Sequence, residues 1–145
     1  MHDLSNLALM SYVHTCQLRV RYGETDQMGF VYYGIYAQYY EVARVEAMRD
    51  IGILYATLEK EHQIFMPVMH MQVRYLRPAR YDDLLSIQTT VPSLPEKEIR
   101  FRYEIRNEAG VLLNGALVQL CFMDAKTEKR ITAPEFITAP LKSYF

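Results

Sequence analysis

Hydrophobic and polar residues alternate along four short stretches of the chain, which is the pattern of β-strands with one buried face. These stretches are CQLRVRY at 16–22, MQVRY at 71–75, LSIQTTV at 85–91 and IRFRYEI at 99–105. A fifth stretch, GALVQLCFM at 115–123, is apolar on both faces and predicts an interior strand. Short segments rich in turn-forming residues separate the last four strands, so we expect an antiparallel meander.

Residues 35–51 have a helical period instead, and the predicted helix is apolar on most of its surface. The segment contains no proline, and Gly52 provides a natural C-terminal stop. A helix this apolar needs cover on most sides, and a single antiparallel sheet curled around it would supply that cover. The i,i+3 spacing predicts two ion pairs on its polar positions, Glu41 with Arg44 and Glu46 with Arg49.

The whole chain, residues 1–145, fits one domain with the order strand, long helix, short helix and four strands. The short helix is predicted at 54–62, and the proline-bracketed tail TAPEFITAP has room for one helical turn. A hydrophobic fraction of 50% and a charged fraction of 23% are ordinary for a globular protein. No apolar run is long enough to cross a bilayer, and the acidic, interrupted N-terminal segment is unlike a signal peptide, so we expect a cytoplasmic protein.

Charge and metal-ligating residues exclude several classes of function. The formal net charge of −1 predicts no general attraction to nucleic acid or to anionic membranes. Cys16 and Cys121 each lie inside an apolar run, which predicts buried, reduced thiols. The four histidines are scattered and no CxxC or HExxH motif occurs, so we expect no metal site.

Candidate chemistry lies just before the long helix, in RYGETDQMGFVYYGI at 21–35. Asp26 precedes the helix start, and Gly29 and Gly34 flank the entrance, where glycine allows tight turns and close approach of a ligand. The first amides of a helix lack internal partners and attract an electron-rich oxygen. A carboxylate beside such amides suits acyl transfer. An acid at this position also suits a helix cap, and the residues alone leave both interpretations open.

A longer ordered motif surrounds Asp26. It consists of an acid, x, Asp, two residues, Gly, an aliphatic residue, an aromatic pair, a further Tyr, and a helix with Glu-x-x-Arg. The matching residues are Glu24, Asp26, Gly29, Val31, Tyr32, Tyr33, Tyr36, Glu41 and Arg44. The motif resembles the signature of the hotdog-fold thioesterases, in the branch around 4-hydroxybenzoyl-CoA thioesterase and the Tol-Pal-associated acyl-CoA thioesterases. Further similar blocks, VRYLRPARYDDLL and FMDAKTEKR, extend the resemblance from about residue 14 to residue 133.

The resemblance implies an α+β hotdog fold, in which an antiparallel β-sheet wraps around one long central α-helix. It implies an acyl-CoA thioesterase that releases a carboxylic acid and free CoA, with no cofactor beyond the CoA of the substrate. Asp26 would be the nucleophile or general base, and the backbone N–H of Tyr33 would hold the thioester oxygen. Such proteins join two sheets into a homodimer with the site at the interface, and often pair dimers into a homotetramer.

The sequence departs from the family pattern at three positions. Many relatives have Asp in place of Glu24, the Tol-Pal-associated branch usually has His in place of Tyr33, and relatives often have Asn in place of Ile35. A neutral imidazole is therefore absent at position 33, and a side-chain amide is absent at position 35. The backbone donor of Tyr33 does not depend on either change.

Further candidate residues each have a structural alternative. Gln27 is a candidate for orienting water or for a cap, and Gly34 for close approach of the substrate. Tyr32 and Tyr36 are candidates for lining an acyl or aryl pocket, although packing against the sheet also explains such tyrosines. Candidates for holding CoA phosphates, with solvated turn charges as the alternative, are Arg77, Arg80, Lys126, Lys129 and Arg130.

Two other functions fit the same resemblance. One is hydrolysis of a thioester carried on acyl-carrier protein, and the other is non-catalytic binding of acyl thioesters by a hotdog protein. A hotdog dehydratase would need a histidine on the helix, and residues 33–52 contain none.

Overall fold

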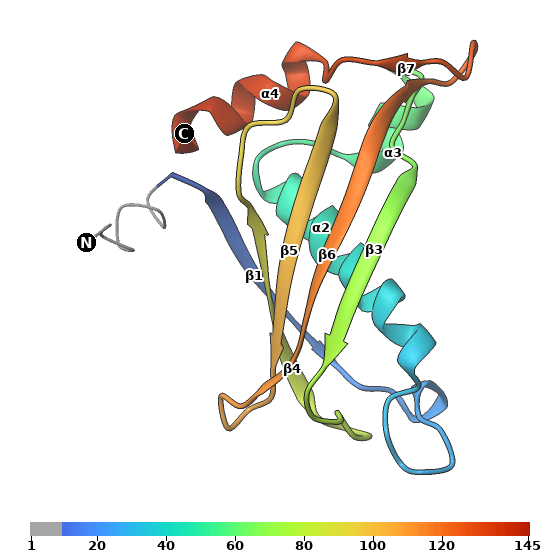
Figure 1. Cartoon of the computed structure of the whole chain (residues 1–145), viewed down its shortest axis with the longest axis vertical. Coiled ribbons are helices and arrows are strands. Elements are labelled where there is room, and N and C mark those ends of the chain that lie inside the picture. The colour runs from blue at the N-terminus through green and yellow to red at the C-terminus, as the bar shows by residue number, and fades with distance from the viewer. Residues whose placement is uncertain (1–9) are drawn as a thin grey trace.

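The computed structural model describes residues 10–145, in which a curved antiparallel sheet lies against the long helix α2 (Figure 1). This arrangement confirms the predicted fold class and the predicted order of strand, long helix, short helix and strands. In chain order the elements are β1 (Tyr12–Arg19), η1 (Tyr22–Glu24), η2 (Tyr33–Ile35), α2 (Tyr36–Asp50), α3 (Tyr55–Lys60), β2 (Ile64–Phe65), β3 (Val68–Tyr75), β4 (Leu84–Val91), β5 (Glu98–Arg106), β6 (Leu112–Asp124), β7 (Arg130–Ile131), α4 (Glu135–Leu141) and η3 (Lys142–Tyr144).

The sheet has β1 at one edge and β3 at the other. The strands β1, β4, β5 and β6 pair in that order, and β3 pairs with the free side of β6. The two short strands β2 and β7, which the alternation pattern did not predict, both pair with the last residues of β6. The strand predicted to be interior, 115–123, lies within β6, and its apolar character on both faces reflects pairing on both sides.

Helix α2 packs on the sheet through aromatic and small residues. Tyr40 and Ala43 are fully buried on the helix, and Phe101 and Tyr103 are buried on the facing strand β5. The rings of Tyr40 and Tyr103 stack with their centroids 4.7 Å apart. Burying aromatic surface of this size dominates the stability of such a core. The outer side of the helix stays open, and Val42 is 46% exposed.

Several element boundaries and contacts differ from the sequence predictions. The first strand ends at Arg19, because the chain turns into η1 instead of extending to residue 22. The tail forms seven helical residues in α4, where Ile137 is buried, and not a single turn. Glu46 pairs with Arg49 at 3.4 Å as predicted.

The predicted pair of Glu41 with Arg44 is wrong, because no ion pair joins them in the described residues. Arg44 instead lies beside the hydroxyls of Tyr55 and Tyr103. Burial raises the pKa of both tyrosines, and the nearby guanidinium of Arg44 acts in the opposite direction.

Two further predictions concern cysteines and the membrane. Both cysteines are free thiols; Cys121 is buried and Cys16 is partly buried. Within residues 10–145, none of the helices has the length and apolar character that a membrane span requires.

The hydroxyl of Tyr12 ties the first strand to the C-terminal end of α2. It lies 2.6 Å from the carbonyl oxygen of Ala47 and 3.1 Å from Oδ2 of Asp50. Tyr12 is 1% exposed, so these hydrogen bonds replace water that the hydroxyl cannot reach. Its ring also packs on Tyr144, with centroids 4.8 Å apart.

We predict that Tyr12→Phe lowers the free energy of unfolding by roughly 1–2 kcal/mol, because the Ala47 carbonyl loses its buried partner. Urea unfolding followed by circular dichroism measures the change. Tyr22→Phe is the matched control, since the Tyr22 side chain is 80% exposed and should unfold as the wild type does. Equal stability of Tyr12→Phe and the wild type would show that this hydroxyl does not fasten the helix.

Candidate active site

Asp26 lies in a tight loop in which its own side chain accepts two backbone hydrogen bonds. The amides of Met28 and Phe30 donate to Oδ1 at 2.9 and 3.2 Å. The Asp26 amide donates to the Phe30 carbonyl at 2.8 Å, and Gly29 adopts a φ of 80°, which glycine tolerates without strain. Oδ2 makes no hydrogen bond with any residue of 10–145. One oxygen is therefore fixed, and the other is available to a ligand.

The loop is fastened to the segment that follows β3. The Val31 amide donates to the Ala79 carbonyl at 2.8 Å, and Phe30 forms an isolated antiparallel bridge with Arg80. The Arg80 guanidinium lies 5.0 Å from the centre of the Phe30 ring. Arg80, a candidate for CoA phosphates, therefore has a packing contact in this loop.

Glu24 holds the loop from the other side. It is 8% exposed, and its carboxylate accepts hydrogen bonds from the Arg21 amide at 2.8 Å, the Tyr39 hydroxyl at 3.0 Å and the Arg21 guanidinium at 3.2 Å. Burial by itself would raise the pKa of Glu24, but these hydrogen bonds together lower it below the ordinary carboxyl value. The Glu24 carbonyl also accepts the Tyr32 amide at 2.9 Å. Glu24 thus connects the Asp26 loop to α2 and has a structural role.

The long helix begins with the single turn η2, which continues directly into α2. The Ile35 amide donates to the Tyr32 carbonyl at 2.9 Å, whereas the amides of Tyr33 and Gly34 have no acceptor within residues 10–145. Unpaired amides at a helix start carry partial positive charge and attract an anion. Asp26 does not cap this helix, since its hydrogen bonds go to Met28 and Phe30.

A cavity of about 290 Å³ brings Asp26 and the helix start together. Four of the predicted site residues line it, namely Asp26, Tyr33, Tyr36 and Arg77. The other lining residues are Met28, Phe30, Val31, Tyr75, Leu76 and Pro78. Sequence reasoning did not select Tyr75 and Leu76, because they come from the end of β3 and the residue after it, and only the tertiary fold brings them to the helix start.

The walls of this cavity are mostly aromatic. Tyr36 and Tyr75 meet nearly edge-to-face, with ring centroids 5.5 Å apart, and the Tyr75 hydroxyl lies 3.3 Å from the Tyr33 carbonyl oxygen. Burial raises the pKa of Tyr36 above its ordinary value, so this ring stays neutral. Such walls suit an apolar or aromatic acyl group.

Three predicted residues lie outside the cavity lining. The Tyr32 ring packs on the Tyr33 ring at 4.7 Å, on the outside of the helix start. A Cβ at Gly34 would lie 2.9 Å from the Tyr32 ring, so Gly34 makes room for that ring. Gln27 is exposed.

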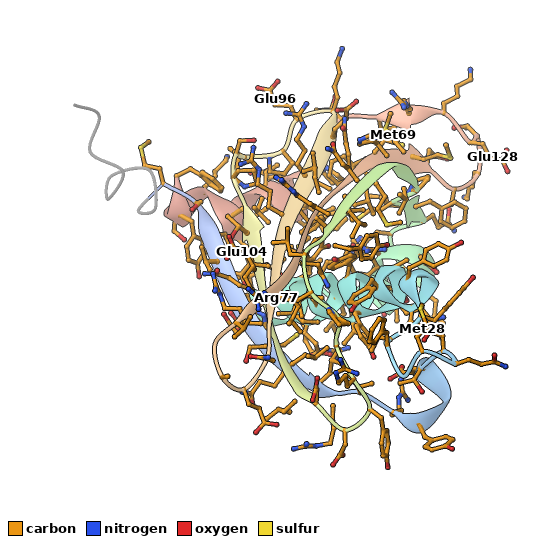
Figure 2. The ribbon with its side chains drawn as sticks, turned by 60° about the horizontal axis from the view of Figure 1, so that its bottom comes forward. Met28, Met69, Arg77, Glu96, Glu104 and Glu128 are labelled. Carbon is orange, nitrogen blue, oxygen red and sulfur yellow. The ribbon has the colours of Figure 1, made fainter. Side chains whose placement is uncertain are left out.

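The candidate cations of the β6–β7 hairpin, two in its turn and one at the start of β7, are distant from Asp26 in the same chain. These are Lys126, Lys129 and Arg130. Figure 1 places that turn at the opposite end of the sheet from the Asp26 loop, and Figure 2 agrees, with Glu128 marking the turn and Met28 marking the loop. In the described residues, no group of three or more His, Cys, Asp or Glu side chains is arranged to hold a metal ion.

The geometry combines a carboxylate with one free oxygen, unpaired amides at a helix start, and an aromatic cavity. A carboxylate of this kind attacks a carbonyl carbon or takes a proton from water. Amides placed where negative charge develops stabilise a tetrahedral intermediate. The arrangement therefore supports acyl transfer from a thioester.

Comparison with known proteins identifies the class. The model of the Thioesterase-like superfamily matches residues 20–141, so the chain belongs to this superfamily. Acyl-CoA thioester hydrolase YbgC of Escherichia coli O6:H1 is 37% identical over 125 residues, which cover 86% of this chain and 92% of that protein. The predicted resemblance to the hotdog thioesterases is confirmed.

Solved structures agree. The DHNA-CoA thioesterase of Staphylococcus aureus has a TM-score of 0.80 and 32% identity, with 83% of this chain and 80% of that chain covered. A structure of 4-hydroxybenzoyl CoA thioesterase has a TM-score of 0.81, with coverage of 90% and 99%. Its identity of 21% supports the shared fold alone.

We predict a pH-dependent loss of stability that Glu24 controls. The folded-state pKa of Glu24 is lowered, so its contribution is complete above the ordinary value of 4.5 and disappears as the pH falls through the lower folded value. Glu24→Gln should lower the free energy of unfolding by roughly 1–3 kcal/mol at pH 7, because charge-assisted hydrogen bonds are lost.

Urea unfolding of wild type and Glu24→Gln across pH 3 to pH 7 measures this effect. The gap between the two proteins should narrow below about pH 4.5, where the wild-type carboxylate takes up a proton. A gap that stays constant across this range would exclude the carboxylate as its source.

Proposed function

We propose that this chain hydrolyses acyl-CoA thioesters to a carboxylic acid and free CoA in the cavity beside Asp26. The observation that carries the proposal is the arrangement of Asp26, whose Oδ1 is fixed by two amides while Oδ2 is free. The same cavity is lined by Tyr33, whose amide has no acceptor in the described residues. The similarity to YbgC, which is named for this activity, supports the same reaction.

Two routes use the same residues. In the first, Oδ2 of Asp26 attacks the thioester carbonyl carbon, the carbonyl oxygen gains negative charge beside the Tyr33 amide, and the C–S bond breaks with CoA leaving as thiolate. Water then hydrolyses the mixed anhydride, which restores the carboxylate. In the second, Asp26 takes a proton from water as the water attacks the same carbon. The CoA thiolate is a good leaving group near neutral pH, so neither route requires a separate general acid.

The cavity offers apolar contacts to the acyl group of the substrate and a charged contact to its CoA portion. The rings of Tyr36 and Tyr75 face the position of the acyl group, and Arg77 is the cation among the lining residues. Arginine suits phosphate oxygens, so Arg77 is placed to contact the CoA portion as it leaves the cavity. The same site would accept a thioester on acyl-carrier protein, and a cytoplasmic location remains a prediction.

We propose that a second copy of the chain completes the site by pairing along β3. This edge strand exposes apolar side chains, including Val68 at 50% and Met71 at 45%. The opposite edge, β1, turns mainly polar residues outward. An unprotected apolar edge strand favours pairing with another strand. Since Tyr75 ends β3 and lines the cavity at 50% exposure, a partner on this edge would also cover the cavity.

We predict that Asp26→Asn lowers kcat at least roughly 100-fold, with little change in KM, because the isosteric amide neither attacks nor accepts a proton. Thiol release is followed by absorbance on a panel of aliphatic and aromatic acyl-CoAs. Asp124→Asn is the matched control, since Asp124 also holds turn amides through its side chain but lies at the far end of β6.

The panel also separates the alternatives. Unchanged kcat in Asp26→Asn would remove Asp26 from the reaction. A wild type that binds acyl-CoA and releases no thiol from any ester would identify a non-catalytic binding protein. Turnover of an acyl-carrier-protein thioester, assayed beside the panel, without turnover of any acyl-CoA would identify acyl-carrier protein as the carrier of the substrate.

We predict that Met71→Lys shifts the protein from a dimer or tetramer to a single chain and lowers thioesterase activity, because it places a charge on the exposed edge strand. Light scattering coupled to gel filtration measures the mass. Val13→Lys, on the opposite edge at 42% exposure, should leave the mass unchanged. A wild type that is a stable monomer would contradict the shared site.

A further inference from the structure

The arginines of residues 10–145 separate into those with a carboxylate partner and those without. Four of them pair with an Asp or Glu within 4.0 Å, namely Arg19, Arg21, Arg49 and Arg106. Among the arginines without such a partner in the described residues, Arg74, Arg100 and Arg102 lie on β3 and β5. The others without one, located outside these two strands, are Arg44, Arg77, Arg80 and Arg130. Three of the unpaired arginines therefore lie on the two strands that flank β6.

These three arginines lie on the face of the sheet that is turned away from α2. On β5, Phe101 and Tyr103 are buried against the helix, so the alternating residues Arg100 and Arg102 point the other way. On β3, Val73 packs against the core and Arg74 follows it on the outer face.

A hollow of about 230 Å³ lies between Arg74 and Arg102. Gly115 of β6 stands opposite Arg74 in the register and provides a floor without a side chain. The neighbouring residue on this face of β6, Leu117, stands opposite Arg102. Gln72 adds an amide to the lining. The hollow thus has two cations at its sides and neutral groups elsewhere.

The nearest acid along the strand does not neutralise these cations. Glu104 stands opposite Gly115 on the same face, but its carboxylate pairs with Arg106 at 3.0 Å. Two arginines around a small hollow therefore lack an anion. Arginine binds phosphate oxygens with two parallel hydrogen bonds, so a phosphate group is the ligand that fits this charge and geometry.

The hollow lies on the outer face of the sheet and the cavity that holds Asp26 lies at the helix start, and both include residues near the C-terminal end of β3. Tyr75 and Arg77 line that cavity, and Arg74 precedes Tyr75 on the same strand. In an acyl-CoA, a long pantetheine arm separates the thioester from the phosphates, so the phosphates must lie outside a cavity that holds the acyl group. A substrate bound at both places would pass around the C-terminal end of β3, where Leu76 and Arg77 line the cavity.

We infer that the hollow between Arg74 and Arg102 binds a phosphate group of the CoA portion of the substrate. This inference rests on the proposed function and adds a contact that selects CoA esters over thioesters without phosphate. The contact forms in both the ground state and the transition state, so it lowers KM and leaves kcat unchanged.

The test compares wild type with the double variant Arg74→Gln/Arg102→Gln on two thioesters of one acyl group, one on CoA and one on N-acetylcysteamine. The CoA ester should show a KM raised about tenfold at unchanged kcat, as expected from the loss of charge-assisted hydrogen bonds. The N-acetylcysteamine ester, which has no phosphate, should show no change. Arg19→Gln is the matched control, because Arg19 lies on the edge strand β1 and pairs with Asp82, and its kinetics should equal those of the wild type.

A second variant tests the hollow without altering charge. Gly115→Val keeps both arginines and fills the floor, and a Cβ at this position makes only an ordinary contact of 3.5 Å with the Tyr103 carbonyl. It should raise KM for the CoA ester alone. Circular dichroism and thermal unfolding confirm that each variant is folded.

Two results would overturn the inference. One is an unchanged KM for the CoA ester in the folded double variant, and the other is an equal rise for both esters. A wild type inactive on both esters would remove the proposed function instead. In that case, calorimetric titration with CoA tests the phosphate site. Equal affinity of wild type and double variant for CoA would overturn the inference, and weaker binding by the double variant would support it.

Discussion

The fixed orientation of the Asp26 carboxylate is the constraint on which the proposed chemistry depends. Amides of Met28 and Phe30 occupy Oδ1, so the side chain cannot rotate freely and Oδ2 keeps one direction. An exposed aspartate without these bonds would sample several rotamers, and restricting it to one of them when substrate binds would cost conformational entropy. The loop supplies this order in advance, which is how a single carboxylate serves as an effective catalytic group.

The rest of the chain keeps that loop in place. Val31 and Phe30 attach it to the segment after β3, and Glu24 attaches it to α2 through Tyr39. Helix α2 is in turn held by aromatic packing on β5 and by the Tyr12 hydroxyl at its other end. Because these contacts are buried, small displacements of the helix start relative to Asp26 are costly. The same contacts therefore stabilise the fold and fix the geometry of the site.

The sequence predicted the elements well because their periodicity is local. Alternation located β3, β4 and β5 within a few residues, a run that is apolar on both faces located β6, and the apolar helix implied a sheet around it. The motif selected Asp26, Tyr33 and Tyr36, and the suitability of arginine for phosphate selected Arg77; the structure brings these four residues to one cavity.

Properties set by tertiary contacts were not predictable in this way. Tyr75 and Leu76 line the cavity because the tertiary fold brings the end of β3 to the helix start, which no local pattern encodes. Arg44 lies beside buried tyrosine hydroxyls of β5 and α3, so its i,i+3 spacing from Glu41 did not predict its surroundings. From the sequence, Lys129 and Arg130 were candidates for holding CoA phosphates. In the structure they lie at the end of β6 that is far from Asp26.

The most direct test of the central claim is a crystal structure with a non-hydrolysable acyl-CoA analogue that retains the carbonyl group. We expect the carbonyl oxygen to lie within hydrogen-bonding distance of the Tyr33 amide, and Oδ2 of Asp26 to face the carbonyl carbon directly or through one water. A carbonyl group bound away from both would contradict the assignment of Asp26 and the helix start as the active site.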